Sequence, residues 1–311
     1  MAFYRPDPAM GQRLEALVQQ LEQQGRHGLA DQLSITWVRY DQSLPEVALG
    51  AGRELSLGTP TAEPRGLGAS WQGTRLRYPA SVVKLVYLVA AEAWLQRQWL
   101  AEEPELRRAL AAMIQHSSND ATSLVMDRLS GTTSGPDLPP EPLALWSRQR
   151  QQVNRWLQQL GWPELEGWNA CQKTWEDGPY GRERQSYGPT GENRNRLNSD
   201  GVARLLEAVL AGDLLSPPAC RRLQLLLQRP LDLAQRQADP ENQVDGFLGE
   251  GAPDGARLWS KAGWMSQARH DAAYLEAPDT QPALLVVFTE GPACAQDTTL
   301  LPALATALLQ P

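Results

Sequence analysis

The order of predicted strands and helices along the chain restricts its fold more than any other feature. Residues 34–40 are β-branched and aromatic, and three further strand candidates, 256–264, 267–276 and 283–289, follow one another near the end. Helical spacing of apolar residues dominates the long stretch between them, and helical patterns also open and close the chain. This order predicts an α+β fold, an α/β sandwich, in which an antiparallel sheet from both chain termini is flanked by the terminal helices.

An all-helical domain is therefore expected to be inserted into the sheet domain. We predict a sheet domain from residues 1–64 and 240–311 and a helical domain from 65–239. The tract 44–64 contains Gly and Pro and is predicted to form hairpin-like strands. Residues 161–196 lack a helical or strand period, and so long a loop inside a compact domain usually serves a function.

Composition and charge argue against several classes of protein. The net charge of -7 and the absence of a basic run argue against a nucleic-acid partner. The three cysteines and three histidines are scattered, so neither a disulfide framework nor a metal site is expected, and no cofactor is predicted. The longest mostly apolar stretch, 81–95, carries two charges and is too short for a bilayer, so no membrane partner is expected. The N-terminus lacks the apolar segment of a secretory signal, which predicts a cytoplasmic protein.

Lysine is nearly absent from the chain. Only three of the 29 basic residues are lysines, Lys84, Lys173 and Lys261, and the other 26 are arginines. Arginine is effectively never deprotonated, so a lysine kept in such a chain marks a place where a compact ammonium or a removable proton is needed. A codon bias would explain why lysine is rare but not where the three lysines remain. Their neighbourhoods are therefore the first places to look for chemistry.

Ser81 and Lys84 lie three residues apart at the start of a predicted helix and share one of its faces. A serine in a first helical turn feels the positive end of the helix dipole, and a partly desolvated lysine can lose its proton and act as a base. The pair therefore suits a nucleophile and its activating base. An ordinary amphipathic helix whose lysine reaches solvent is the alternative explanation.

A second polar cluster, Ser117 to Asp120, lies where one predicted helix ends and the next begins. Ser117 and Asn119 are two residues apart, so both side chains could point into one cleft, where the hydroxyl would relay a proton and the amide would hold a substrate carbonyl. Helix capping is the structural alternative, because Ser, Asn and Asp are the favoured N-cap residues.

Lys261 lies on a predicted strand in the sequence Trp-Ser-Lys-Ala-Gly-Trp. Gly263 leaves room for a substrate to approach closely along the strand, and the backbone N–H of Trp264 could form one arm of an oxyanion hole. A solvent-facing lysine on an edge strand is the alternative. Arg269, on the next predicted strand, is either an auxiliary carboxylate anchor or a surface arginine.

The order Ser-x-x-Lys, Ser-x-Asn, Lys-x-Gly resembles that of the penicillin-recognising serine enzymes, the class A β-lactamases and DD-peptidases. The resemblance covers most of the chain and implies their fold, with the Ser-x-x-Lys motif at the head of the central helix of the helical domain. It also implies that Ser81 is the acylated nucleophile, Lys84 its activating partner and Ser117 the proton donor to the leaving nitrogen.

The same resemblance implies which residues bind the substrate. Asn119 would bind the substrate's side-chain amide, and Lys261 would attract its carboxylate. The backbone N–H groups of Ser81 and Trp264 would form the oxyanion hole. Ala262 replaces the Thr or Ser usual in the family's Lys-x-Gly motif, which removes a hydroxyl that would otherwise hydrogen-bond the carboxylate.

The family's loop carboxylate, which activates water in a Glu-x-x-x-Asn pattern, has no unambiguous counterpart. Glu176, preceded by Trp175, is its nearest equivalent in the long loop. A solvated loop carboxylate is the alternative for Glu176 and for its three competitors. These competitors are Glu164, Glu166 and Glu183.

We therefore predict a serine hydrolase that cleaves β-lactam bonds, which are cyclic amides, through an acyl-enzyme at Ser81. Its partner is a small-molecule or peptide amide substrate, and the sequence does not define an oligomeric state. A DD-peptidase or esterase at the same site is the alternative favoured by the short span between the first two motifs, which predicts an open cleft. A non-catalytic penicillin-binding-like protein is the third reading, although a binder has no need for Lys84 beside Ser81. The cytoplasmic location expected from the N-terminus differs from the periplasmic or secreted location typical of the family.

Overall fold

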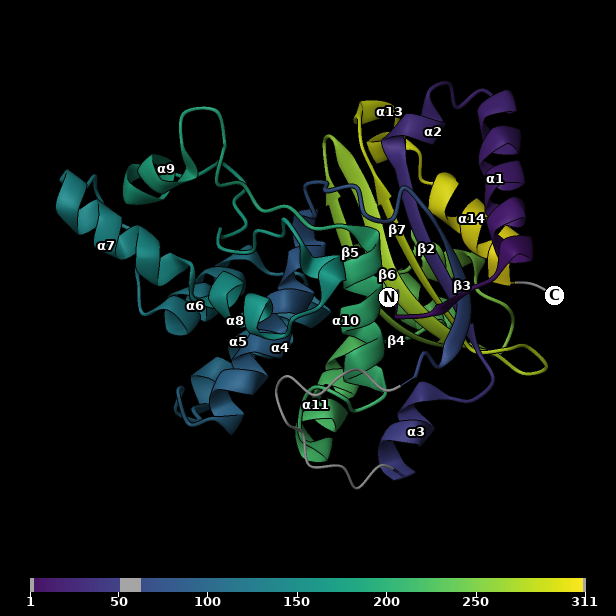
Figure 1. The fold of residues 1–311 in the computed structure, drawn as a ribbon, viewed down its shortest axis with the longest axis horizontal. Helices are drawn as coiled ribbons and strands as arrows, with labels where there is room; N and C mark the ends of the chain where they lie inside the picture. The colour runs from purple at the N-terminus through teal and green to yellow at the C-terminus, as the bar shows by residue number, and fades with distance from the viewer. Residues whose placement is uncertain (1–2, 51–62, 310–311) are drawn as a thin grey trace.

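The computed structural model describes residues 3–50 and 63–309. Within these residues, a seven-stranded sheet forms the centre, with strand order β1-β3-β2-β7-β6-β5-β4 (Figure 1). Neighbouring strands are antiparallel except β1 and β3, which are parallel. The strands are β1 (Arg5–Pro6), β2 (Leu33–Tyr40), β3 (Gly66–Trp71), β4 (Gln228–Arg229), β5 (Arg257–Met265), β6 (Ala268–Glu276) and β7 (Ala283–Thr289). The predicted α+β fold, with a mainly antiparallel sheet drawn from both ends of the chain, is confirmed.

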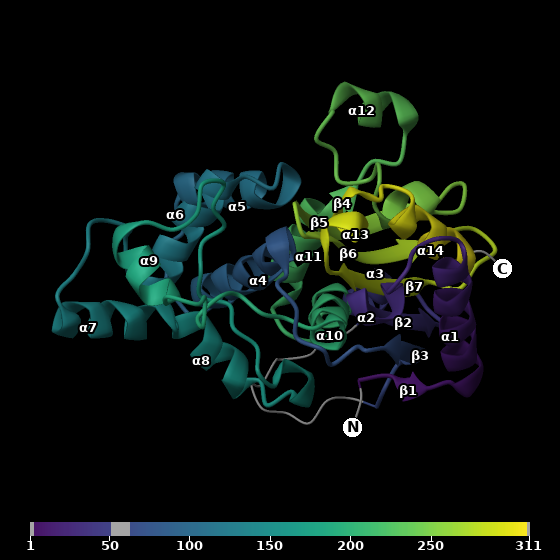
Figure 2. The same ribbon diagram turned by 90° about the horizontal axis from the view of Figure 1, so that it is seen from above.

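Helices cover both faces of this sheet. α1 and α14 lie on one face and α10 on the other, while α4 to α9 form a helical body beside it (Figure 2). None of the described helices is long and apolar enough to cross a membrane. The α-helices are α1 (Pro8–Gln23), α2 (Leu29–Gln32), α3 (Leu44–Gly50), α4 (Val83–Gln96), α5 (Pro104–Gln115), α6 (Asn119–Ser130), α7 (Pro140–Arg150), α8 (Gln152–Gln159), α9 (Gly181–Tyr187), α10 (Ser199–Leu210), α11 (Pro217–Leu227), α12 (Leu233–Ala238), α13 (Pro292–Gln296) and α14 (Leu300–Leu309). Three 3₁₀ turns are η1 (Ala80–Val82), η2 (Pro163–Leu165) and η3 (Leu248–Gly251).

The two faces of the sheet contribute to two hydrophobic cores. On β2, Ile35 and Trp37 pack into the core shared with α1 and α14. Val38 and Tyr40 instead pack into the core shared with α4 and α10. Because successive side chains of a strand point to opposite faces, an almost wholly buried strand supplies both cores. The sheet therefore separates the terminal helices from the helical body.

The boundaries predicted for the sheet domain differ from the sheet itself. β3 lies beyond the boundary placed at residue 64 and pairs with β2 along its whole length. β4 likewise lies within the segment assigned to the helical domain, and the division into two domains stays a prediction. The prediction of hairpin-like strands over residues 44–64 is wrong for its first part, which forms the helix α3. Residues 51–62 of that tract lie outside the described residues.

Close strand packing explains why β3 has no strand signal in the sequence. A Cβ on Gly66 would lie 2.5 Å from Val38 Cγ1, and one on Gly68 would lie 2.8 Å from Trp37 O. Both glycines therefore serve the close approach of β2 rather than a turn. A glycine-rich segment of this kind lacks the β-branched composition that marks a strand in the sequence.

Candidate active site

Ser81 lies where the first turn before α4 meets β5. It is the middle residue of η1, and α4 follows directly, with Lys84 in its first turn. α4 is buried over most of its length and packs against α5, α6, α8 and α11. The pair predicted from the sequence is therefore at the head of a central, buried helix.

Gly263 allows β5 to pass directly against η1. A Cβ at this position would lie 2.8 Å from Ser81 N and 2.9 Å from Val82 N, which is closer than side chains approach backbone atoms. Ala80, just before Ser81, has a φ of +45°, a conformation that residues other than glycine rarely adopt. The surrounding structure holds such strain in place, and strained residues cluster at functional sites.

His270 supports the same turn from β6, where it is paired with Gly263. Its Nδ1 accepts a hydrogen bond from Thr289 N at 3.0 Å, so the ring proton is on Nε2 and is donated to Tyr78 O at 2.8 Å. Burial lowers the pKa of His270 to about 4, and the ring is neutral at neutral pH. Sequence reasoning missed this residue, because its partner lies far away in the chain.

Lys84 connects the first two motifs. Its Nζ is 2.9 Å from Asn119 Oδ1 and 3.2 Å from Ser117 Oγ, and it also donates to Ser117 O. Burial lowers the pKa of Lys84 to about 7, and the charge of Glu176 opposes this effect. A substantial fraction of Lys84 is therefore neutral at neutral pH and can accept a proton. The alternative, a lysine that reaches solvent, is wrong because the side chain is fully buried.

Ser118, rather than its neighbours, caps the helix that follows. Its Oγ accepts a hydrogen bond from Ala121 N at 3.1 Å, which makes it the N-cap of α6. Ser117 has a φ of +53° and, like Asn119, contacts Lys84. Helix capping therefore explains Ser118, whereas the side chains of Ser117 and Asn119 contact Lys84 instead.

Lys261 is buried rather than solvent-facing, with 0% of its surface exposed. Its Nζ donates to Ser117 Oγ at 3.1 Å, to Ala262 O at 2.6 Å and to Gln243 Oε1. Burial, followed by the charges of Lys84 and Arg229, holds the pKa of Lys261 well below its usual range. Ser117 therefore lies between the two motif lysines. Gln243 was missed, since no motif marks it.

Trp264 and Arg269 converge on one backbone carbonyl. The Trp264 side chain is 58% exposed, and its Nε1 donates to Ala295 O at 2.9 Å. Arg269 Nε donates to the same oxygen at 3.0 Å, and Nη1 donates to Gly246 O at 3.4 Å. Arg269 is only 8% exposed, so it is not a surface arginine. Its guanidinium is engaged by backbone atoms.

The third lysine anchors the long loop beside the site. Lys173 Nζ donates to Asp127 Oδ2 at 2.9 Å and to Ser134 Oγ at 2.8 Å. The next residue, Thr174, donates its hydroxyl to Asn119 Oδ1 at 2.7 Å. This contact brings the loop to the Ser-x-Asn motif. Thr174 also escaped sequence reasoning, although its lysine neighbour marked the segment.

The four loop carboxylates have different surroundings. Glu164 pairs with Arg204, and Glu183 pairs with Arg150, so both serve buried ion pairs. Glu166 and Glu176 are exposed. Glu176 is the one whose charge acts on Lys84. Across residues 3–50 and 63–309, no group of three His, Cys, Asp or Glu side chains is arranged to hold a metal ion.

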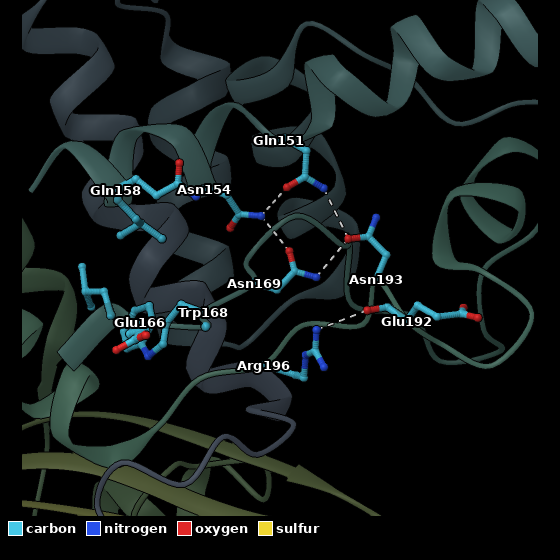
Figure 3. A pocket seen from close by; sticks show the side chains of 12 residues that line it. Gln151, Asn154, Gln158, Glu166, Trp168, Asn169, Glu192, Asn193 and Arg196 are labelled. Atoms are coloured by element: carbon cyan, nitrogen blue, oxygen red, sulfur yellow. Dashed lines mark hydrogen bonds between the residues drawn. The ribbon is translucent and has the colours of Figure 1, made fainter. Parts of the chain in front are cut away.

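A separate polar pocket lies between α8 and the long loop, with a volume of about 480 Å³ (Figure 3). Its side-chain amides bond to one another: Asn154 Nδ2 donates to Asn169 Oδ1 at 2.6 Å, and Asn169 Nδ2 donates to Asn193 Oδ1 at 3.0 Å. Because these amides satisfy each other, the pocket wall holds the loop in place.

Comparisons with known proteins agree with this arrangement. The model described as the β-lactamase enzyme family matches residues 93–310, and the chain therefore belongs to this family of β-lactamase-like serine hydrolases. The match begins after Ser81 and Lys84. No curated protein gives a significant match.

Solved structures share the fold over nearly the whole chain. PBP-A superposes with a TM-score of 0.61 at 17% identity, covering 98% of this chain and 96% of that one. A β-lactamase from Xanthomonas campestris pv. campestris gives a TM-score of 0.63 at 16% identity, with 96% and 98% covered. A variant of the class A β-lactamase of the last common ancestor of Gram-negative bacteria gives 0.59 at 18% identity, with 94% and 96% covered. At these identities the likeness shows the fold alone.

Proposed function

We propose that the protein is a serine hydrolase that forms an acyl-enzyme at Ser81 with β-lactams and related amides or esters. The contact chain from Lys84 through Ser117 Oγ to Lys261 carries this proposal. A serine beside a lysine of near-neutral pKa, with a hydroxyl to relay protons, is the set of groups that acyl transfer needs. Membership of the β-lactamase enzyme family supports it. So does an acyl-enzyme complex of a PBP-A mutant with penicillin G, which is 17% identical to this chain.

Acylation begins when neutral Lys84 accepts the proton of Ser81 Oγ as this oxygen attacks the carbonyl carbon. The backbone N–H groups of Ser81 and Trp264 stabilise the oxyanion that forms. The bond to the leaving nitrogen breaks as Ser117 Oγ gives that nitrogen a proton, and Ser117 regains one from Lys84. Asn119 binds the amide of the acyl group. Protons therefore balance over the step, and Lys84 ends neutral.

Deacylation requires a water that attacks the Ser81 ester. Glu176 accepts the proton of this water in our proposal, because its charge reaches Lys84 and the paired carboxylates of the loop are already engaged. Its exposure favours the second candidate, a DD-peptidase or esterase in which a lactam-derived acyl group persists. The two candidates share the acylation step and differ in the lifetime of the acyl-enzyme.

The test follows the intact mass of the protein during incubation with benzylpenicillin, beside the Ser81→Ala variant. An adduct that forms and decays in the wild type alone supports lactam hydrolysis, and one that persists supports the peptidase. Parallel incubation with 4-nitrophenyl butanoate tests the esterase. If neither compound is consumed faster by the folded wild type than by Ser81→Ala, the protein is a binder and the proposal is refuted.

A further inference from the structure

β5 runs past the nucleophile Ser81 and presents a different side chain on each side of it. Gly263 lies against Ser81, Lys261 is two residues before it and Met265 two residues after it. With a rise near 3.3 Å per residue, the last two are about 13 Å apart along the strand. Lys261 contacts Ser117, the proposed proton donor, and so marks the side of the leaving group. Met265 accordingly marks the acyl side.

The leaving-group side offers a substrate carboxylate no unengaged cation from the motif residues. Lys261 Nζ already lies within hydrogen-bond distance of three acceptors in its own protein: Gln243 Oε1, Ser117 Oγ and Ala262 O. Its side chain is fully buried, so a carboxylate cannot reach it without breaking these contacts. Residue 262 carries no hydroxyl, and the Arg269 guanidinium donates to two backbone carbonyls.

The acyl side holds Arg194. Its guanidinium carbon lies 3.7 Å from the centroid of the Tyr78 ring, three residues before Ser81. Its Nη2 lies 3.8 Å from Met265 Sδ, at the end of β5. The side chain is partly exposed, and no carboxylate oxygen of the described residues lies within 4 Å of it. The cation thus lies between the nucleophile's turn and β5, stacked on the Tyr78 ring and without a carboxylate partner among the described residues.

The backbone under Arg194 is fixed by buried amides. Arg194 O accepts a hydrogen bond from Asn169 Nδ2 at 3.0 Å, and Asn169 belongs to the amide network of Figure 3. The next residue, Asn195, accepts the backbone N–H groups of Cys171 and Gln172 at 3.0 and 2.9 Å. A side chain carried on an ordered backbone loses less freedom when it binds a ligand.

We propose that Arg194 binds a carboxylate on the acyl group of the substrate, and that the leaving group of this substrate is uncharged. The inference rests on the proposed function, because attack by Ser81 defines which side is the acyl side. It names a substrate class: amides or esters of acyl groups that end in a carboxylate. Benzylpenicillin, whose carboxylate belongs to the leaving-group side, then acylates through the strain of its ring rather than through recognition of its charge.

Three thioesters that differ in the position of one carboxylate test this placement. The ethanethiol thioester of butanoylglycine is neutral, and that of glutarylglycine carries the charge on the acyl group. The mercaptoacetate thioester of butanoylglycine carries it on the leaving group. Thiol release, read with a thiol-reactive dye, gives kcat/KM for each. We expect the glutarylglycine thioester to exceed the neutral one by about tenfold, since a charge-assisted hydrogen bond contributes this much. We expect the mercaptoacetate thioester to show no gain.

Substitutions in the loop that carries Arg194 test whether this residue causes the preference for the glutarylglycine thioester. In Arg194→Ala the ratio of glutarylglycine to butanoylglycine thioester should fall to about one, and Arg194→Lys should restore part of it. Arg196→Ala is the matched control, because Arg196 lies two residues away and donates to Glu192 O instead. It should keep the wild-type ratio.

The outcomes separate this inference from the proposed function. If the mercaptoacetate thioester is the best substrate, or if Arg194→Ala keeps the wild-type ratio, the placement of charge is wrong while the acyl-enzyme proposal stands. If none of the three thioesters is cleaved faster by the wild type than by Ser81→Ala, both proposals fall.

Discussion

Acylation should depend on pH through Lys84, whose pKa burial lowers to about 7. Only the neutral amine can accept the proton of Ser81, so the acylation rate follows the neutral fraction. For a pKa of 7 this fraction is about 0.1 at pH 6 and about 0.9 at pH 8, which is roughly a tenfold rise, with a plateau above. Stopped-flow bursts of nitrophenolate from 4-nitrophenyl butanoate at constant ionic strength measure the rate. A rate that is flat across this range, or that rises only near the pKa of an exposed lysine, would refute the reasoning.

Two variants test whether Lys84 is the titrating group. Glu176→Gln should move the midpoint to lower pH, because the carboxylate raises the pKa of Lys84. Lys84→Arg should abolish the burst at every pH, since a guanidinium keeps its proton. The protein's stability gives an independent readout. Between about pH 7 and pH 10 the unfolded chain binds a proton at Lys84 that the folded chain does not, so the free energy of unfolding contributed by this group rises with pH. Lys84→Met should remove that contribution.

Two further substitutions test the geometry of the site. Gly263→Ala places a Cβ 2.8 Å from Ser81 N, so β5 must move away from η1. We expect kcat/KM to fall at least about tenfold as a result. Gly11→Ala is the control, because a Cβ at Gly11 meets nothing within 4 Å. An unchanged kcat/KM in Gly263→Ala would show that the approach of β5 to Ser81 does not matter for catalysis. Glu176→Gln should lengthen the lifetime of the penicillin adduct on intact-mass traces without preventing its formation, and an unchanged lifetime would remove Glu176 as the base for water.

Much of the fold could be predicted, because its signals are local. The spacing of apolar residues marks α1, α5 and α10, and β-branched composition marks β2 and β7. The three motifs could be found for the same reason, since each lies within a few residues of chain. The contacts that join the motifs at Lys84 and Lys261 belong to the tertiary structure. The family resemblance predicted that the motifs meet, whereas their spacing in the sequence did not.

The residues that sequence reasoning missed act across long separations. Thr174 reaches Asn119 from 55 residues away, and His270 reaches Tyr78 from 192 residues away. Gln243 contacts Lys261 from a segment without secondary structure of its own. A single polar residue on a loop or a strand forms no sequence pattern, so its contacts are seen only in the folded chain. Thr174 is a partial exception, because the scarcity of lysine draws attention to its neighbour Lys173 and so to this segment.

The most direct test of the acyl-enzyme locates the acyl group in the sequence. Wild-type protein is mixed with benzylpenicillin, quenched in acid and digested with trypsin, which cuts after Arg77 and Lys84. The peptide from Tyr78 to Lys84 contains Ser81 as its one serine. We predict the penicilloyl mass on this peptide and on Ser81 within it, and no label in Ser81→Ala. A label on Ser117, on Tyr78 or on any lysine, with Ser81 unmodified, would contradict the central claim.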